Sequence, residues 1–334
     1  MTIRFAVIGI NHNHIFGQVN ALLAAGATLV GFFAAEDDLG GDFAGRYPQA
    51  IRFNSIACIL DDPNIALVAS AGINADRAPL GIEVMRAGKD FLSDKPGMTS
   101  LAQLAEVRRV QAETKRIYSI YYSEHFGVRC VVKAGDLVQA GAIGSVVNTV
   151  GIGPHRINRR SRPGWFFERE RYGGILTDIA SHQIEQFLFF TGAEDAEVVA
   201  ANVANRANPA DPELQNFGDM LLRAPSATGY VRVDWLTPDG LPTWGDGRLM
   251  IVGTKGTIEM RKYIDIGGQN GTDHLFLIDN NSVQRIDCTY VDLPFGRQLV
   301  HDVLYRTESA MPQARCFKAM ELALTAQAMA EARG

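Results

Sequence analysis

Residues 91–97, Phe-Leu-Ser-Asp-Lys-Pro-Gly, decide how the first half of this chain is interpreted. An apolar run that is typical of a buried strand ends there in an acid, a lysine and a proline. Proline fixes its own φ and keeps the residue before it extended, so Lys95 should stay outside any helix. A lysine held in this way can point its ammonium into a cleft, although an ordinary turn with a solvated lysine also fits. A second segment, residues 173–182 (Gly-Gly-Ile-Leu-Thr-Asp-Ile-Ala-Ser-His), favours the interpretation in which Lys95 points into a cleft.

Apolar strands alternate with helices on both sides of the first segment, up to residue 122. Asp76 is expected to cap one helix, and Ser100 with Gln103 forms a capping-box pattern at another. The alternation predicts a doubly wound parallel sheet, which binds ligands outside the carboxyl ends of its strands. Gly9 and Lys95 both follow expected strands and should therefore face that crevice. The expected strands are residues 3–9, 28–33, 51–53, 66–70, 90–93 and 117–121, and the expected helices are 15–25, 40–47, 76–87 and 100–114.

Residues 123–334 follow a different pattern. Most of the strands come after two helices, and the turns between them are rich in Gly, Asp, Asn and Pro. This order predicts an α+β domain built on a mostly antiparallel open sheet, with a long polar loop at residues 154–172. The expected helices are 128–140, 175–191 and 313–332, and the expected strands are 145–151, 197–204, 217–223, 228–236, 248–252, 257–261 and 274–278.

Length and composition are those of a globular protein with two domains. The chain has 334 residues, more than one hydrophobic core usually supports, and 47% of them are hydrophobic. Its formal charge of −5 argues against nucleic acid as a partner. No segment approaches the ~20 apolar residues of a membrane span. Four scattered cysteines without a Cys-x-x-Cys pair, and no signal-peptide pattern, predict reduced thiols and a cytoplasmic location.

The turn after the first strand resembles a nucleotide-binding fingerprint only in part. A Gly-x-Gly-x-x-Gly motif would occupy residues 9–14, but the chain has Gly9 alone, with Asn11 and His14 at the other two glycine positions. The helix N-terminus there still offers free N–H groups and a positive dipole end to a phosphate. We therefore expect Gly9, Asn11, His12 and His14 to contact a dinucleotide.

A ribose-binding acid is expected at the end of the second strand. Ala34 stands where an aspartate is usual, and Glu36 follows two residues later. Glu36 can reach the ribose hydroxyls, although a solvated turn formed by Glu36 and Asp37 fits equally well. No arginine or lysine close to it in sequence supports a 2′-phosphate.

Asp178 and His182 are four residues apart in a segment with helical apolar spacing. This spacing places both side chains on one helix face, about one turn apart. A histidine near its usual pKa can exchange a proton at neutral pH, and a nearby carboxylate can orient it. An ordinary surface ion pair is the alternative. A metal site would have to recruit His12, His14 or His155, whose spacing does not match that of metal ligands, so none is expected.

Taken together, these motifs resemble the Gfo/Idh/MocA family of NAD(P)-dependent oxidoreductases over nearly the whole chain. The family has a Glu-Lys-Pro motif after the fifth strand and a Gly-Gly-Gly-x-Leu-x-Asp-x-Gly-x-His helix in its second domain. The matching segments here are Asp94-Lys95-Pro96, residues 173–182, Ala87-Gly88-Lys89, Trp165 and Gly253-Thr254-Lys255-Gly256.

The resemblance implies a role for each matching residue. Lys95 matches the catalytic lysine, Asp178 the substrate-binding acid and His182 the proton-transferring histidine. Arg77, where the family often has histidine, and Ser123-Glu124-His125, where it often has Asn-x-Arg, depart from the pattern. Cofactor contacts are expected at Gly9, Asn11, His12, His14, Glu36, Gly72, Asn74, Asp94, Lys95 and Pro96, and substrate contacts at Glu124, His125, His155, Arg156, Trp165, Asp178 and His182.

The resemblance also implies a fold and an activity. Residues 1–122 would form a Rossmann domain for NAD or NADP, and residues 123–334 a domain for substrate binding and oligomerisation as a homodimer or homotetramer. The expected reaction moves a hydride between nicotinamide and a hydroxyl-bearing carbon of a sugar, inositol or related polyol. The arginine-rich loop, with Arg156 and Arg162, hints at a sugar acid. Two alternatives are a ligand sensor without turnover, and an enzyme in which the hydride step begins an elimination or a glycoside cleavage.

Overall fold

A computed structural model describes residues 2–332, and the chain divides into two compact units. The first unit runs to Tyr121 and takes in residues 171–173 and 294–317, and the second holds the remainder. The predicted boundary near residue 122 lies at the first crossing between the units, but the chain later returns to the first unit twice. Of helix α12 (Gln313–Glu331), residues 313–317 belong to the first unit and the others to the second.

The first unit is a six-stranded parallel sheet with the order β3-β2-β1-β4-β5-β6. Its four central strands are short and mostly buried, because both faces of a doubly wound sheet are covered. The strands are β1 (Arg4–Ile8), β2 (Thr28–Phe33), β3 (Ile51–Arg52), β4 (Leu67–Ser70), β5 (Asp90–Asp94) and β6 (Tyr118–Tyr121). The helices are α1 (His14–Ala24), α2 (Asp37–Arg46), α3 (Ala57–Leu60), α4 (Asn74–Arg86), α5 (Leu101–Thr114) and α11 (Phe295–Tyr305).

The second unit is built on an eight-stranded sheet with the order β14-β13-β12-β11-β7-β10-β9-β8. Every neighbouring pair is antiparallel except β7 with β10, so the predicted mostly antiparallel sheet is confirmed. The strands are β7 (Val146–Pro154), β8 (Glu197–Ala204), β9 (Phe217–Arg223), β10 (Thr228–Asp234), β11 (Arg248–Gly253), β12 (Gly256–Arg261), β13 (His274–Asp279) and β14 (Val283–Ile286). The helices are α6 (Ser123–Phe126), α7 (Arg129–Gln139), α8 (Arg169–Tyr172), α9 (Ile175–Asp178) and α10 (Ser181–Thr191), and η1 (Arg159–Ser161) and η2 (Gly164–Phe167) are 3₁₀ turns.

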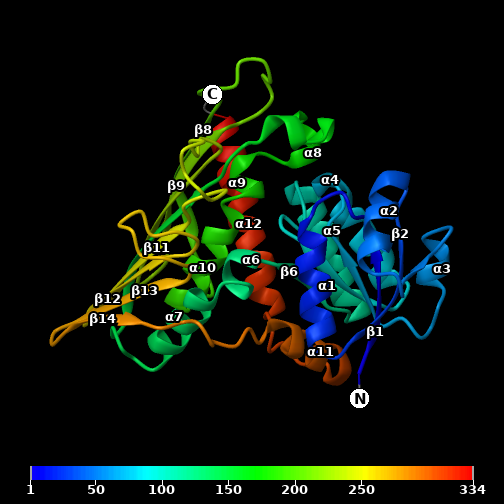
Figure 1. Cartoon of the computed structure of the whole chain (residues 1–334), viewed down its shortest axis with the longest axis horizontal. Coiled ribbons are helices and arrows are strands. Elements are labelled where there is room, and N and C mark those ends of the chain that lie inside the picture. The colour runs from blue at the N-terminus through cyan, green and yellow to red at the C-terminus, as the bar shows by residue number, and fades with distance from the viewer. Residues whose placement is uncertain (1, 333–334) are drawn as a thin grey trace. The chain divides into compact units, whose positions relative to one another are not determined.

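One face of this second sheet carries the core of the unit. Helix α10 packs on β7 and β10, and α7 packs on β12 and β13 (Figure 1). Inward-facing side chains such as Leu249, Ile251 and Met260 meet α7 in one buried cluster. The opposite face alternates with the buried one along each strand and stays accessible, as period-two patterning requires.

Three local predictions need correction. Helix α4 begins at Asn74, so Asp76 lies in its first turn and does not cap it. The expected helix 175–191 is broken into α9 and α10. Five elements were not predicted, since each is brief or weakly patterned in sequence: α3, α6, α8, α11 and β14. Ser100 caps α5 as predicted, because its Oγ accepts the Gln103 N–H at 3.1 Å. The other half of the capping box differs, since Gln103 Oε1 accepts the Thr99 N–H at 2.8 Å and not that of Ser100.

Candidate active site

Gly9, at the carboxyl end of β1, lies against the turn that follows β4. Its φ is +79°, and a Cβ built on it would lie 3.0 Å from the Gly72 Cα. Only glycine combines this backbone angle with so close an approach. The sheet order, which puts β1 beside β4, thus brings together two glycines that were predicted to contact the cofactor.

The loop between β1 and α1 keeps hydrogen-bond donors for a phosphate although it lacks two of the three fingerprint glycines. The His12 N–H donates to the Ala71 carbonyl at 2.9 Å, which fixes the loop against the end of β4. Within residues 2–332, the backbone N–H groups of Asn11 and Asn13 have no acceptor. Free N–H groups at the start of a helix are suited to an anion. The residues present therefore fit a dinucleotide pyrophosphate.

The predicted ribose-binding acid is held by a residue of the same loop. Asn11 Nδ2 donates to Glu36 Oε1 at 2.8 Å, so two predicted cofactor residues lie together. The structure adds an arginine that the sequence neighbourhood did not show: Arg52 of β3 donates to the Ala34 carbonyl at 3.3 Å and to Asp37 at 2.8 Å. The end of β2 thus offers a carboxylate for ribose hydroxyls and a guanidinium beside it.

Asp94, the first residue of the Asp-Lys-Pro motif, is buried among cationic groups. His14 Nδ1 lies 3.0 Å from Asp94 Oδ1, and Arg77 Nη2 lies 3.3 Å from Oδ2. Burial raises the pKa of this carboxyl, but the charges of His14 and Arg77 outweigh burial and hold it far below its usual range. Asp94 is therefore ionised, and the side chain of His14 ties the start of α1 to the end of β5.

His12, His14 and Asp94 also have the composition of a metal site, with one ligand atom from each within 4.8 Å of the others. The contacts favour an ion-paired carboxylate instead. His12 Nδ1 already accepts the His14 N–H at 3.2 Å, and the Arg77 guanidinium lies against Asp94. Burial, followed by the charge of His14, lowers the pKa of His12 well below its usual value. His12 is thus kept neutral beside Asp94.

Arg77, a departure from the family pattern, fastens the turn that carries Lys95. Its Nε donates to the Gly72 carbonyl at 2.8 Å, and its Nη1 donates to the carbonyls of Lys95 and, at 3.1 Å, Pro96. Arg77 and Lys95 are 1% and 4% exposed. The predicted catalytic lysine is therefore a buried residue in a fixed turn, and not a solvated one.

Asn74, predicted beside Gly72 as a cofactor contact, begins α4. Its Nδ2 donates to the Tyr172 carbonyl at 2.8 Å, within the first unit. This amide therefore orders residues 171–173 against the turn after β4.

Asp178 and His182 lie on either side of the break between α9 and α10. The Ala180 N–H bonds to the Ile175 carbonyl five residues back at 3.4 Å, and the His182 N–H bonds to Ile179 only three residues back at 3.2 Å. Such irregular turns inside helices are frequent at functional sites. Both side chains are buried, at 5% and 1% exposure. The two residues are thus held by a non-helical step, not by consecutive turns of one helix as predicted.

Glu124 is buried in the second unit and paired with a lysine. Lys262 Nζ lies 2.6 Å from Glu124 Oε2, and Gln183 Nε2 donates to the same oxygen at 3.0 Å. Burial raises the pKa of Glu124, but Lys262, then His182 and His155, lower it to about 2. Glu124 is therefore a fixed anion whose charge acts on two predicted site histidines.

The other predicted substrate residues have different surroundings. His125 Nδ1 lies 2.8 Å from Glu185 Oε2, and its ring packs on Phe189. Arg156 is half-buried and donates to the carbonyls of Pro238, at 2.8 Å, and Leu241. His125 and Arg156 thus have partners within the chain, and their contacts with a substrate remain predictions.

Two predicted substrate residues lie among aromatic rings. The ring of His155 is 5.1 Å from that of Trp235 and 4.5 Å from that of Trp244. Trp165 is half-buried beside Phe166, with ring centroids 6.1 Å apart. His155 and Trp165 thus belong to the part of the second unit that is built from β7, η2, β10 and the loop before β11.

Lys262 and Trp235 were not predicted as site residues. Each lies in a predicted strand or just after one, and only the sheet register places it near Glu124 or His155.

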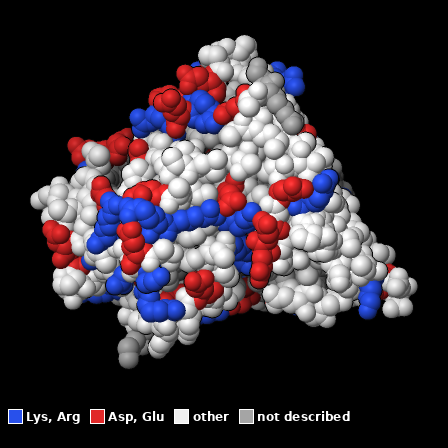
Figure 2. Space-filling view, turned by 180° about the vertical axis from the view of Figure 1, so that it is seen from behind, with Lys and Arg blue, Asp and Glu red and all other residues white. Residues whose placement is uncertain are grey.

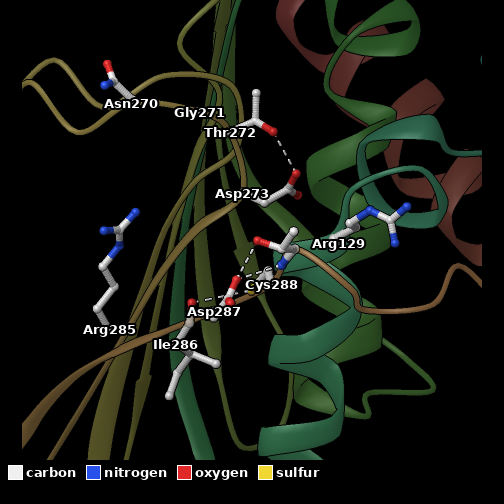
Figure 3. Close-up of a pocket in the computed structure, with 10 residues that line it drawn as sticks. Arg129, Asn270, Gly271, Thr272, Asp273, Arg285, Ile286, Asp287 and Cys288 are labelled. Atoms are coloured by element: carbon white, nitrogen blue, oxygen red, sulfur yellow. Dashed lines mark hydrogen bonds between the residues drawn. The ribbon is translucent and has the colours of Figure 1, made fainter.

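A pocket of about 630 Å³ lies elsewhere in the second unit, beside β13, β14 and α7 (Figure 3). Arg129, Asp273, Arg285 and Asp287 contribute charges of both signs to its lining. Asp273 accepts the Cys130 N–H, and Asp287 accepts the Thr289 hydroxyl at 2.6 Å, so these acids have partners within the chain. None of the predicted catalytic residues lines this pocket.

Comparisons with known proteins agree with this architecture. A family model described as the GFO/IDH/MocA C-terminal domain matches residues 131–259. The crystal structure of an inferred oxidoreductase from Erwinia carotovora atroseptica is 45% identical, with a TM-score of 0.95 and 98% of each chain covered. Levoglucosan dehydrogenase in complex with NADH and levoglucosan has a TM-score of 0.81 over 100% of this chain and 98% of that one, at 17% identity.

Relatives with a named activity are similar over a shorter stretch. Levoglucosan dehydrogenase from Pseudarthrobacter phenanthrenivorans is 27% identical over 164 residues, which are 47% of this chain and 41% of that protein. The matches to the curated relatives span about half of their length or less.

Proposed function

Because the chain belongs to the Gfo/Idh/MocA family, we propose that it is an NAD(P)-dependent oxidoreductase that moves a hydride between nicotinamide and a hydroxyl-bearing carbon of a sugar or related polyol. The observation that carries this proposal is the state of Lys95: it is 4% exposed, follows β5 at the carboxyl edge of the parallel sheet, and sits in a turn that Arg77 fastens. A sensor without turnover would not need a buried lysine in that place. Curated relatives named as sugar dehydrogenases and reductases support the substrate class.

The cofactor residues fit a dinucleotide. Gly9 and the free N–H groups of Asn11 and Asn13 would hold the pyrophosphate, and Glu36 the ribose hydroxyls. When bound, the nicotinamide accepts or returns the hydride. Glu36 favours NAD, and Arg52 is the residue that would accommodate a 2′-phosphate.

The chain's own residues would handle the proton and the developing charge. His182 would take the hydroxyl proton as the hydride leaves, since an imidazole exchanges protons near neutral pH. The ammonium of Lys95 would stabilise the developing carbonyl oxygen, a role that is strongest away from water. Asp178 would orient the substrate hydroxyl and the imidazole.

Lys95→Ala tests the proposed reaction. Binding of NAD(H) and NADP(H) is measured first by nicotinamide fluorescence, and a panel of sugars, polyols and sugar acids is then screened for turnover. Loss of an electrostatic group of this kind lowers kcat about 100-fold or more. Lys95→Ala should do so while the cofactor still binds, and Lys255→Ala, which changes an exposed lysine, should leave kcat unchanged. Full turnover by Lys95→Ala would contradict the mechanism, and cofactor binding with no turnover of any compound would favour the sensor.

We also propose that the enzyme is a homodimer or homotetramer in the cytoplasm. The outward face of the eight-stranded sheet exposes apolar side chains on several strands, including Leu221, Met250 and Ile278 at 46%, 42% and 38%. Exposed apolar area of this kind usually marks a protein interface. The four cysteines carry free thiols, which is typical of a reducing compartment. Among residues 2–332, no helix has the length and apolar character to cross a bilayer.

A further inference from the structure

Arg162, in the loop between β7 and α9, is the residue from which we infer the substrate class. Its guanidinium carbon lies 4.5 Å from the ring centroid of Phe166 and 4.9 Å from that of Trp235. Its Nε donates to the Ile157 carbonyl at 3.0 Å. The two rings and this bond fix the plane of the guanidinium, so that its remaining donors point in set directions.

The terminal nitrogens of Arg162 make no hydrogen bond or ion pair with the described residues. Within residues 2–332, no acceptor hydrogen-bonds to Nη1 or Nη2, and no carboxylate lies within 4.0 Å. The neighbouring Arg159 differs, since Asp211 binds it at 2.6 and 2.7 Å. Arg160 is exposed to solvent and needs no partner. Arg162 is thus a half-buried arginine of this loop whose terminal nitrogens have no anion bound to them among the described residues.

The surroundings of Arg162 match a polar ligand. Burial lowers the pKa of Arg162 while the charge of Asp178 raises it, so the predicted substrate-binding acid lies within electrostatic range. The adjacent Trp235 is 4% exposed, and its indole N–H has no acceptor among the described residues. Buried donors are normally satisfied. The same small region therefore holds a preoriented cation, an unsatisfied donor and the aromatic rings of Phe166 and Trp235.

We propose that the substrate is a sugar acid, a uronate or aldonate, and that Arg162 binds its carboxylate through the two terminal nitrogens. A planar guanidinium matches a carboxylate in a two-pronged pair, which a lysine cannot reproduce. In this arrangement Asp178 receives a hydroxyl of the same molecule and the rings beside Arg162 cover its apolar faces. This inference rests on the proposed function and narrows its substrate class.

Matched pairs of compounds test it: D-glucuronate with D-glucose, D-galacturonate with D-galactose, and D-gluconate with D-glucitol. For each, kcat/KM is measured with the preferred cofactor, and binding of the acid to the cofactor complex is measured by calorimetry. The variants are Arg162→Gln and Arg162→Lys, and Arg160→Gln is the control because it removes the same charge from an exposed position of the same loop. Thermal melting of each variant shows whether it is folded.

The wild type should prefer at least one acid over its neutral counterpart by 10-fold or more. Hydrogen bonds to charged groups contribute enough that Arg162→Gln should weaken binding and kcat/KM for the acid about 10- to 100-fold. The neutral compound should change less than 3-fold, Arg162→Lys should be intermediate, and Arg160→Gln should match the wild type. If Arg162→Gln does not fold, the same comparison is made with Arg162→Lys alone.

Three outcomes would overturn the inference: a preference for neutral compounds, an equal loss on acid and neutral compounds in Arg162→Gln, or no binding of any acid. Binding of an acid that depends on Arg162, without turnover of any compound, would support the carboxylate site while contradicting the proposed oxidoreductase.

Discussion

Single buried side chains hold the proposed site in shape, and Arg77 is the plainest case. It donates to the Gly72, Lys95 and Pro96 carbonyls and pairs with Asp94. One residue thus joins the turn after β4 to the turn after β5. Removing it would leave several buried acceptors unsatisfied, and each of these costs free energy.

Arg77→Gln should lower the free energy of unfolding by about 3 kcal/mol or more, the range found when one partner of a buried pair is removed. Arg86→Gln on the same helix is the control: Arg86 pairs with Glu106 at 3.0 Å on the surface, and its loss should cost less than about 1 kcal/mol. Urea unfolding curves measure both. Equal stability of the two variants would show that the Arg77 contacts contribute little.

The lowered pKa of Glu124 predicts that the free energy of unfolding depends on pH. Its pKa is about 2 in the folded protein and near its usual 4.5 when unfolded, because Lys262 outweighs the effect of burial. Its ionised form therefore stabilises the fold fully above pH 4.5, and this contribution, about 3 kcal/mol at most, is lost as the pH falls towards 2.

Glu124→Gln should abolish this part of the acid sensitivity. Its unfolding free energy should fall less steeply between pH 4.5 and 2 than that of the wild type, although it starts lower because Lys262 is left unpaired. Urea unfolding at several pH values measures the slope. Parallel slopes for the two proteins would contradict the assigned pairing.

At the scale of elements, glycines distinguish packed helix faces from open ones. Gly81 of α4 faces the sheet, where a Cβ would lie 2.7 Å from Phe91 Cδ1 and also close to the ring of Tyr118. Gly41 of α2 has no atom within 4 Å of the same position. The two helices therefore tolerate alanine differently, although the sequence shows a glycine in each.

Gly81→Ala should lower stability by about 1 to 3 kcal/mol, since overpacking shifts buried rings. Gly41→Ala should raise it by about 0.5 to 1 kcal/mol, because alanine restricts the unfolded chain and favours the helix. Thermal and urea unfolding of both variants give the signs. A stabilising Gly81→Ala would show that α4 does not pack closely on β5 and β6.

On the scale of the whole molecule, charged side chains of both signs are mixed on one face, and exposed apolar side chains lie on the outward face of the eight-stranded sheet. Basic and acidic side chains lie beside one another on the face drawn in Figure 2, which matches a small net charge of −5. The outward face of the eight-stranded sheet instead carries a row of partly apolar positions, in which Val150 of β7 pairs in register with Met250 of β11 and Tyr230 of β10. Such a surface suits a second copy of the chain.

Met250→Glu should shift the protein towards the monomer in size-exclusion chromatography with light scattering, because a carboxylate would be buried at the proposed interface. Ile266→Glu changes an apolar residue that is 61% exposed and lies outside the strands, and it should leave the mass unchanged. A monomeric wild type, or an unchanged oligomer in Met250→Glu, would contradict the proposed interface.

The sequence alone determined that the chain has two parts, one built on a parallel sheet and one on a mostly antiparallel sheet, and it determined most of their elements. Strand and helix types follow from local periodicity and turn residues, so the parallel sheet, the antiparallel sheet and the helix N-cap at Ser100 could all be predicted. The family motifs also identified Lys95, Asp178 and His182, which remain predictions as catalytic residues. Short elements such as α3 and β14 escaped because a few residues carry too weak a pattern.

Tertiary structure decided the contacts between residues distant in sequence. The neighbours β2 and β3 bring Arg52 to the end of β2, and α1 carries His14 to Asp94. Lys262 reaches Glu124 across 138 residues, and Trp235 stacks on Arg162. Propensity and spacing act over a few residues, whereas these pairs depend on strand order and register. The sequence therefore specified the groups that can do chemistry, and the fold specified which of them are buried, which are paired and which keep a hydrogen-bond donor without an acceptor.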